Sequence, residues 1–578
     1  MTTTRFPALI LSWLFLQSLC HGFSFRTTTS TTKNHPHFRR RPEHQQVSES
    51  FSSATTSSRR IRSSTRLLQS NLFRPSESSS SADDKEESSG PLQSVDDEVN
   101  VVPTTNSKTD ELKSKPAGDA VEVDEEIIVD PTLGAWVPIG SVSSLEGLDP
   151  VPVEVFGTQL VVWKKKKGDD DKEDSWSVLL DECPHRMAPL SQGRVDPKTN
   201  CIECPYHGWQ FDNEGTLTRL PQLEQDKVLP NANARSYPTK VHGDLLFAFL
   251  PTRLHGESFP QNDTVPIDYY EDLKELLLDR NQTFYTRELP YSWDFLVENL
   301  LDGPAHLPFA HHSYGSRRDD AATVPMKTLV SNFTHYVYQS AYIRNGAERY
   351  RQFGFQRPFL AYQDTERGPN NGEWKKTLLF FCVPVREGRS RVITNFDTVV
   401  RTKDPNAPDW KVHLFNNQFF DSDVWVHETE INVRSKEEED PQAVPKYLYP
   451  TSSDVSVQGF RKWWTQFGYN KAPRNSFGPA SIQNLKRLSR KEQTDPWQGH
   501  TQKCSKCRLI LIKAKKYKRI SLFASSISAI YMLNRSNPFL ASAFIIAGIL
   551  VRERADKMIR ALEGEHSPSD VSDRTFAS

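Results

Sequence analysis

Two short segments combine cysteine and histidine at spacings that suit a metal. Cys183-Pro-His185 comes first, and Cys204 follows with His207 three residues after it. Two thiolates and two imidazoles could hold a zinc ion, or a [2Fe–2S] cluster in which two histidines replace two cysteines on one iron. Zinc fingers present paired cysteines before paired histidines, whereas here each segment supplies one of each. This order favours the iron–sulfur cluster, which suits one-electron transfer.

A second pair of histidines lies about 100 residues further along the chain. His306 and His311 are separated by four residues, which can place both on one side of a helix that contains some irregularity. His312 competes with His311. With one carboxylate, two histidines form the facial triad of non-heme Fe(II), and this triad leaves positions open for O₂ and substrate. A cluster that delivers electrons and an iron that binds O₂ together indicate an oxygenase.

Residues 183–193 and 204–209 resemble the Rieske family well beyond the four ligands. Respiratory Rieske proteins carry an extra disulfide cysteine near the first histidine, but positions 186–188 hold arginine, methionine and alanine. The chain therefore resembles the oxygenase type. The resemblance implies a Rieske [2Fe–2S] cluster at four residues and a mononuclear Fe(II). The cluster residues are Cys183, His185, Cys204 and His207.

The same resemblance implies the residues of the iron site. The family spacing favours His311 over His312 as the partner of His306. Residues 419–430 resemble the segment that carries the acidic ligand in plant-type members, so Asp423 is the predicted third ligand and Asp421 its alternative. Asp302 and Asn299 are predicted catalytic residues. In the family, the aspartate links a Rieske histidine of one subunit to an iron histidine of another. Here Gly303 is one residue more than the usual spacing, and a π-bulge could absorb it.

The segment after the iron site contains Cys504 and Cys507 in a CxxC motif, with Lys503 and Lys506 beside them. A lone CxxC cannot complete a tetrahedral metal site, so we expect a redox switch that thioredoxin could reduce if the thiols are exposed. Two apolar runs of 14 residues follow, at 520–533 and 538–551, with basic flanks. Each run is shorter than the ~20 residues that span a bilayer. Basic residues precede the first run and follow the second, so a hairpin would place both basic segments on the same side of a membrane. This arrangement nevertheless favours a membrane hairpin.

The N-terminal part has the composition of targeting and linker segments. Residues 1–22 are typical of a signal peptide, and residues 23–76 of a plastid transit peptide, because they are rich in Ser, Thr and Arg and poor in acids. Residues 77–130 hold 16 acids and four lysines, and we expect a disordered acidic linker. The two targeting segments together resemble the presequence of algae with complex plastids.

The composition of the 578 residues excludes two classes of protein. A net charge of −1 argues against a nucleic-acid binder, and seven cysteines are too few for a disulfide scaffold. Short β-type runs from residue 133 onwards give way to mixed helices and strands. We therefore predict an α+β fold: a β-rich Rieske domain at 131–251, a helix-grip-like catalytic domain of antiparallel sheet and helices at 252–490, and a CxxC segment with the membrane hairpin at 491–578.

This combination resembles the plant branch that contains pheophorbide a oxygenase and the 55-kDa translocon component of the inner chloroplast envelope. The resemblance implies a plastid monooxygenase that takes electrons from ferredoxin and opens the ring of pheophorbide a with O₂. The alternatives are a redox-sensing Rieske component of a membrane import complex and an oxygenase of chlorophyllide or protochlorophyllide. The resemblance further implies a homotrimer at the thylakoid or inner envelope membrane.

Overall fold

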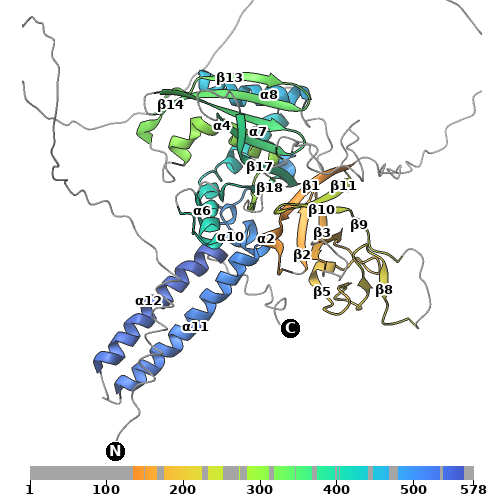
Figure 1. Cartoon of the computed structure of the whole chain (residues 1–578), viewed down its shortest axis with the longest axis vertical. Helices are drawn as coiled ribbons and strands as arrows, with labels where there is room; N and C mark the ends of the chain where they lie inside the picture. The colour runs from red at the N-terminus through yellow and green to blue at the C-terminus, as the bar shows by residue number, and fades with distance from the viewer. Residues whose placement is uncertain are drawn as a thin grey trace, which may run out of the picture. The chain divides into compact units, whose positions relative to one another are not determined.

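The computed structural model describes residues 134–564 with internal gaps (Figure 1). The gaps are 149, 166–174, 224–231, 252–272, 274–276, 278–282, 312–317, 345–346, 367–373, 398–399, 402–403, 440–446, 468–479 and 534–537. All described residues belong to one compact unit, Asp119–Ser578. The predicted signal peptide, the transit peptide and most of the acidic linker precede this unit in the sequence. These segments, and His312, lie outside the described residues.

The first region consists of three small antiparallel sheets, as expected for the β-rich domain. Their strand orders are β1-β11-β10, β2-β3-β4-β9 and β5-β6-β7-β8. The elements are β1 (Gly134–Ser141), α2 (Val142–Leu145), β2 (Val151–Val155), β3 (Thr158–Lys164), β4 (Trp176–Leu180), η1 (Leu190–Gln192), β5 (Arg194–Val195), β6 (Ile202–Glu203), β7 (Gln210–Phe211), β8 (Leu217–Arg219), β9 (Ser236–Tyr237), β10 (Thr239–His242) and β11 (Leu245–Pro251).

Strand β3 separates two cores and thereby places the cysteine loops. Successive side chains of a strand point to opposite faces. Leu160 and Val162 pack into the main core, whereas Val161 and Trp163 pack into a second core. This second core also contains Cys183 and Cys204, both almost fully buried. The apolar run of β3 therefore supports the loops that carry the predicted cluster ligands.

The second region is built on a seven-stranded antiparallel sheet of order β12-β18-β17-β16-β15-β14-β13. Helices α4 and α8 pack against this sheet, and α4 also contacts α7 and α8 (Figure 1). The strands are β12 (Tyr285–Leu289), β13 (Met326–Ser331), β14 (His335–Arg344), β15 (Ala347–Gln356), β16 (Leu360–Glu366), β17 (Trp374–Arg386) and β18 (Arg389–Thr394). The helices are α4 (Trp293–Ala310), η4 (Arg318–Asp320), α6 (Asp409–Asp421), α7 (Val426–Glu439), η5 (Ser452–Asp454) and α8 (Val455–Phe467). The predicted α+β class with an antiparallel sheet and helices is confirmed.

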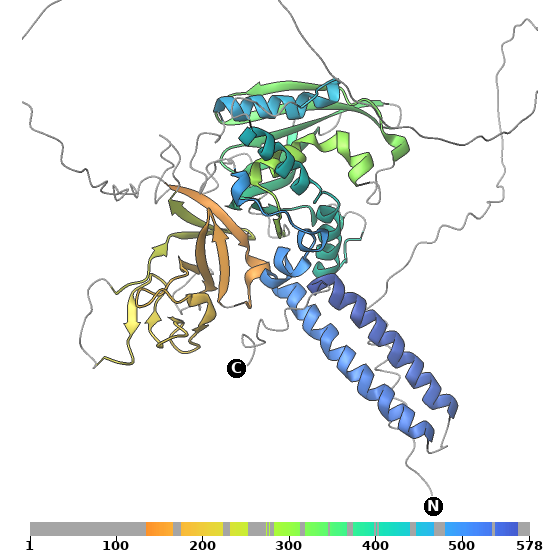
Figure 2. The same cartoon turned by 180° about the vertical axis from the view of Figure 1, so that it is seen from behind.

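The C-terminal segment ends in two long helices that pack side by side (Figures 1 and 2). Its elements are η6 (Ile482–Asn484), α9 (Arg490–Gln493), α10 (Pro496–Gly499), η7 (Thr501–Lys503), α11 (Ser505–Leu533) and α12 (Pro538–Glu563). The predicted helical hairpin is present. Within the described part of the chain, no helix combines the length and the apolar character needed to cross a membrane. The first half of α11 is rich in lysine and arginine, so its apolar run is short.

Candidate metal centres

Two tight loops carry the predicted cluster ligands. In the first loop the amide of Cys183 donates to Ala188 O, and the amide of Met187 donates back to Cys183 O. In the second, the amide of Cys204 donates to Trp209 O. Met187 and Gly208 adopt positive φ values of 57° and 72°, which close the two turns. Both loops therefore hold a cysteine at their base.

The loops bring His185 and His207 together. Their ring centroids are 4.6 Å apart, and His185 stacks on Trp209 with an interplanar angle of 3°. The Nδ1 atoms of both histidines are buried without a hydrogen-bond partner among the described residues. Buried polar atoms are normally paired, so two orphaned nitrogens beside two buried thiols fit a [2Fe–2S] cluster.

The electrostatics of the loops agree with this fit. Burial lowers the pKa of His207, which favours the neutral imidazole that ligates metal. Burial raises the pKa of Cys183 to about 11, so a metal must offset the cost of the thiolate. Met187 is 75% exposed and Tyr206 59% exposed, so the loop tips present apolar surface around the histidines.

Helix α4 carries both histidines of the second site. It is kinked at Gly303, where φ is 24° and ψ is −100°. This irregularity is a kink rather than the expected π-bulge, because glycine tolerates positive φ and the next residue, Pro304, has no amide hydrogen to donate. His306 follows the kink. His311 is the C-cap of the helix, and its amide donates to Leu307 O.

The structure brings His306, His311 and Asp423 into one group whose ligand atoms all lie within 4.8 Å of one another. Asp423 Oδ2 lies 3.0 Å from His311 Nε2 and 4.0 Å from His306 Nε2. Asp423 Oδ1 is buried and makes no hydrogen bond in the described part of the chain. This His-His-Asp arrangement is consistent with a mononuclear iron.

The outer nitrogen of each histidine faces a polar partner. The hydroxyl of Ser422 donates to Phe419 O, at 2.5 Å, and therefore accepts from His311 Nδ1, at 2.8 Å. This tautomer leaves the Nε2 lone pair of His311 free for a metal. Asp302 Oδ2 lies 3.3 Å from His306 Nδ1. Burial lowers the pKa of His306, but the Asp302 and Asp423 carboxylates outweigh burial and hold it above the ordinary value.

Asp421, the alternative third ligand, has a different partner. Its carboxylate pairs with the fully buried guanidinium of Arg287, from β12. The favourable interaction with Arg287 is outweighed by burial, which raises the pKa of Asp421. The two aspartates are two residues apart but have different partners. Asp421 pairs with Arg287, and Asp423 contacts the two histidines.

A cavity of about 420 Å³ opens beside the iron site. Aromatic rings form much of its wall, together with Asn299, Gly303, Arg351 and Gln363. The rings are those of Phe353, Tyr362, Phe380, Phe396, Phe419 and Phe420. A mostly apolar cavity with a few polar groups is typical of a small-molecule site.

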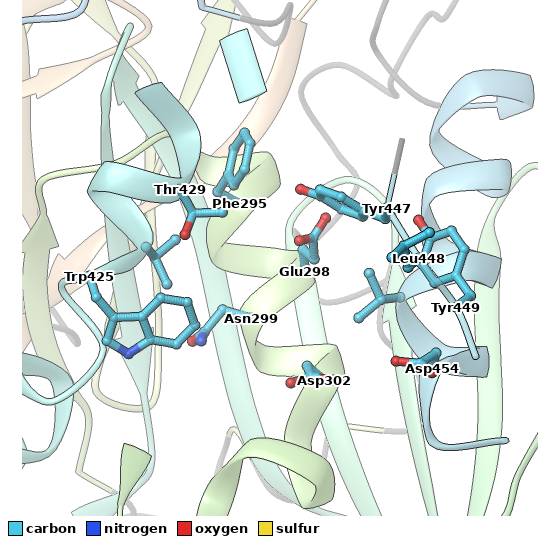
Figure 3. Close-up of a pocket in the computed structure, with 12 residues that line it drawn as sticks. Phe295, Glu298, Asn299, Asp302, Trp425, Thr429, Tyr447, Leu448, Tyr449 and Asp454 are labelled. Atoms are coloured by element: carbon cyan, nitrogen blue, oxygen red, sulfur yellow. The ribbon is translucent and has the colours of Figure 1, made fainter. Parts of the chain in front are cut away.

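A second pocket, of about 280 Å³, contains Asp302 and also reaches Asn299 (Figure 3). Trp425 lies beside Asn299 on one side of this pocket, and Leu448 and Tyr449 lie on the other. Asn299 therefore lies between the iron cavity and this pocket. Asp302 lies beside His306 and also lines this second pocket.

The remaining predicted pair, Cys504 and Cys507, is almost completely buried. Their redox role stays a prediction. The structure places them against His413 and His500, which belong to neither of the predicted metal sites. His500 precedes Cys504 by four residues, and this spacing was an available signal; His413 lies about 90 residues earlier and gave none. Ser422 was also missed, although it lies between the two candidate aspartates.

Comparisons with known proteins agree with this geometry. A Rieske [2Fe-2S] domain model matches residues 135–238, and a pheophorbide a oxygenase model matches residues 355–440. Pheophorbide a oxygenase of Oryza sativa is 31% identical over 64% of this chain and 72% of its own length. Flavonoid 8-hydroxylase 2 of Ocimum basilicum is 27% identical over 69% of this chain and 76% of its own length.

Two further known proteins are similar to this chain. Protein TIC 55 of Pisum sativum is 27% identical over 58% of both chains. The crystal structure of dicamba monooxygenase superposes with a TM-score of 0.43 at 18% identity, over 59% of this chain and 98% of the other. The sequence matches and the two metal centres lead to one conclusion: the chain belongs to the Rieske non-heme iron oxygenases, in the branch of pheophorbide a oxygenase and TIC 55.

Proposed function

We propose that the chain is a plastid monooxygenase that opens the macrocycle of pheophorbide a, a chlorophyll-derived tetrapyrrole. The observation that carries this proposal is the aromatic cavity beside His306, His311 and Asp423. Much of its wall lies within residues 355–440, the segment that matches the pheophorbide a oxygenase model. Flat aromatic rings suit the two faces of a planar macrocycle.

Each part of the site would have a distinct task. A bound Fe(II) would supply the O₂ chemistry at the open positions of the triad. Ser422 keeps His311 in the ligating tautomer. The ring of Phe419, 3.9 Å from that of His311, shields the site from water. Arg351 lines the cavity and would pair with a propionate carboxylate of the tetrapyrrole.

Electrons would enter through the Rieske cluster. Rieske oxygenases take electrons from a reductase or ferredoxin and use O₂, and we propose ferredoxin here. By family analogy, the electron then crosses between subunits of a homotrimer. The exposed apolar tips of the cluster loops, Met187 and Tyr206, are suited to the pocket around Asp302 and Trp425 of a neighbouring copy.

The proposed location is the plastid, at its thylakoid or inner envelope membrane. The plant relatives named above are chloroplastic proteins. Because no described helix is suited to span the bilayer, we propose that the hairpin of α11 and α12 associates with the membrane through its exposed apolar side chains, among them Phe523, Ile530 and Phe539.

The test is a turnover assay with the anaerobically reconstituted chain, ferredoxin and O₂. Pheophorbide a, chlorophyllide a, protochlorophyllide a and a flavone are offered separately, and mass spectrometry identifies the products. We expect pheophorbide a to gain two oxygen atoms and to lose its chlorin absorbance. A formyl product from another chlorin, or a hydroxylated flavone, would instead assign a different substrate. Asp423→Ala is the inactive control, because it removes the carboxylate of the triad.

A second candidate is a redox-sensing component of a plastid import complex, favoured by the similarity to TIC 55. Such a protein would retain both metal centres and leave every compound of the panel unchanged. Absence of product from a fully metallated chain would therefore favour this role over oxygenation.

A further inference from the structure

Four side chains meet in the interior of the structure, three of them from one short segment and the fourth from about 90 residues earlier in the sequence. They are His413 of α6, His500 between α10 and η7, Cys504 at the end of η7, and Cys507 of α11. All four are buried, with at most 3% of each residue exposed. Their ligand atoms all lie within 4.8 Å of one another.

Four of the distances between these atoms are close to those between the ligands of a tetrahedral metal ion. His413 Nδ1 lies 3.2 Å from His500 Nε2, 3.4 Å from Cys504 Sγ and 3.5 Å from Cys507 Sγ. Cys507 Sγ lies 3.3 Å from His500 Nε2. A zinc ion with Zn–S bonds of about 2.3 Å and Zn–N bonds of about 2.0–2.1 Å spaces its tetrahedral ligands about 3.3–3.8 Å apart.

The outer nitrogen of each histidine faces a polar group. The lone pair of the inner nitrogen is then directed toward the other ligand atoms. His500 Nδ1 lies 2.6 Å from Thr286 O and must donate to it, which leaves Nε2 as an acceptor. His413 Nε2 faces the Asp397 carboxylate at 4.0 Å, which favours a lone pair on Nδ1. His413 Nδ1 and His500 Nε2 are 3.2 Å apart, so a cation between them would bind the lone pair of each. A carbonyl or carboxylate behind each histidine is the usual outer partner of a metal ligand.

The charges also balance for a buried ion. Two thiolates neutralise one divalent cation, and two neutral imidazoles add no charge, so the complex carries no net charge into the interior. Closed tetrahedral sites with two cysteines and two histidines hold zinc structurally. The same four donors offer no open position for a substrate.

We propose that His413, His500, Cys504 and Cys507 bind one structural Zn²⁺ ion. The ion joins helix α6 to the start of α11. Helix α6 ends at Asp421, so the zinc would hold in place the helix that leads directly to the iron ligand Asp423. The site is independent of the substrate proposed above, because none of its four residues lines the iron cavity.

Elemental analysis and X-ray absorption on the full chain test this proposal. The protein is purified without added metal, any tag is removed, and zinc and iron are counted per chain. We expect one zinc per chain, in addition to the iron of the two other centres. The zinc K-edge spectrum, which iron does not obscure, should show two sulfur neighbours at about 2.3 Å and two nitrogen neighbours at about 2.0–2.1 Å.

Variants locate the ion. Cys507→Ser and His413→Gln each remove one ligand and should reduce the zinc content at least several-fold. Cys382→Ser is the matched control, because Cys382 is equally buried but lies on β17 outside the site, so its zinc content should equal that of the unmodified chain. Asp397→Asn should weaken zinc affinity by about 10–100-fold in chelator competition, since it removes only the outer carboxylate.

Two results would overturn the proposal. One is a freshly isolated, iron-replete chain that contains no zinc and in which Cys504 and Cys507 form a disulfide, because that outcome would establish the redox pair. The other is zinc without sulfur neighbours in the absorption spectrum, because that outcome would place the ion elsewhere. Both results are measured on the unmodified chain, so neither requires the Cys507→Ser or His413→Gln variant to fold.

Discussion

At the scale of single residues, Asp302 is the predicted link between the Rieske cluster and the mononuclear iron. Its carboxylate lies 3.3 Å from the outer nitrogen of His306 and is 30% exposed in the pocket of Figure 3. It therefore touches an iron histidine without being a predicted ligand. We expect Asp302→Asn to retain both metal centres but to lower steady-state oxygenation about 10–100-fold, the usual effect of losing an outer-shell carboxylate.

The measurement for Asp302→Asn combines metal analysis, the electron paramagnetic resonance signal of the reduced cluster, and the rate at which O₂ reoxidises that cluster. Asp454→Asn, which lines the same pocket away from the iron histidines, is the control. A variant that reoxidises at the normal rate would contradict the bridging role of Asp302.

Gly303 is the residue that allows α4 to present both histidines. A Cβ atom there would lie 3.0 Å from the ring of Phe353, at a φ of 24°. We expect Gly303→Ala to cost about 1–3 kcal/mol in unfolding free energy and to lower the iron content, because His306 directly follows the kink. Gly147→Ala separates the two effects: Gly147 also has a positive φ but open space around it, so only stability should fall. Iron binding unchanged in Gly303→Ala would contradict this prediction.

At the scale of elements, buried charges hold α4 in place. Arg434 of α7 and Arg461 of α8 both pair with Asp294, in the first turn of α4, and Arg461 also pairs with Glu298. Removing one partner of a buried pair is strongly destabilising, because the other charge remains buried without compensation. These contacts explain how a kinked helix can still hold His306 and His311 close to Asp423.

Glu430 of α7 makes the stability of the contact between α7 and the start of α4 depend on pH. It accepts a hydrogen bond from the amide of Ser292, the N-cap of α4. Burial, together with the charge of Asp294, raises the pKa of Glu430 from 4.5 to about 7. Protonated Glu430 therefore contributes to the free energy of unfolding. This contribution is fully present below pH 4.5 and is lost as the pH rises through 7.

Replacing Glu430 by glutamine should remove that dependence. We expect the unfolding free energy of the unmodified chain to fall between pH 5 and pH 8 by about 2.5 kcal/mol more than that of Glu430→Gln. Denaturant titrations of both proteins at the two pH values measure this difference. Parallel pH profiles would show that Glu430 titrates normally in the folded protein.

At the scale of the whole molecule, the hairpin of α11 and α12 exposes apolar side chains that no described residue covers. Phe523 is 71% exposed, Ile527 52% and Ile530 61%. Large exposed apolar patches mark interaction surfaces. We expect the full chain to float with vesicles of galactolipid and phosphatidylglycerol, and the triple change of these three residues to serine to lower binding by about tenfold per residue.

The control for this measurement is Leu329→Ser. Leu329 is 42% exposed on β13, so the change removes apolar surface outside the hairpin. Binding that persists in the triple variant, or that falls equally in the control, would exclude the hairpin as the membrane contact.

Local spacing was sufficient to predict much of the chemistry. Cys183 and His185 share one loop, as do Cys204 and His207, and His306 and His311 belong to one helix with its cap. Covalent geometry over a few residues limits where such side chains can point, so a pattern of short spacings identifies a site before folding is known. The α+β class followed in the same way from runs of β-type and helical residues.

Only the tertiary structure decided the contacts between distant segments. Asp421 and Asp423 look alike in the sequence, and they differ because Arg287 of β12 reaches the first and the histidines of α4 reach the second. Cys504 and Cys507 stand as an isolated CxxC pair in the sequence, and only folding places His413, about 90 residues away in the chain, beside them. Packing of whole elements selects such partners, and sequence spacing carries no record of that packing.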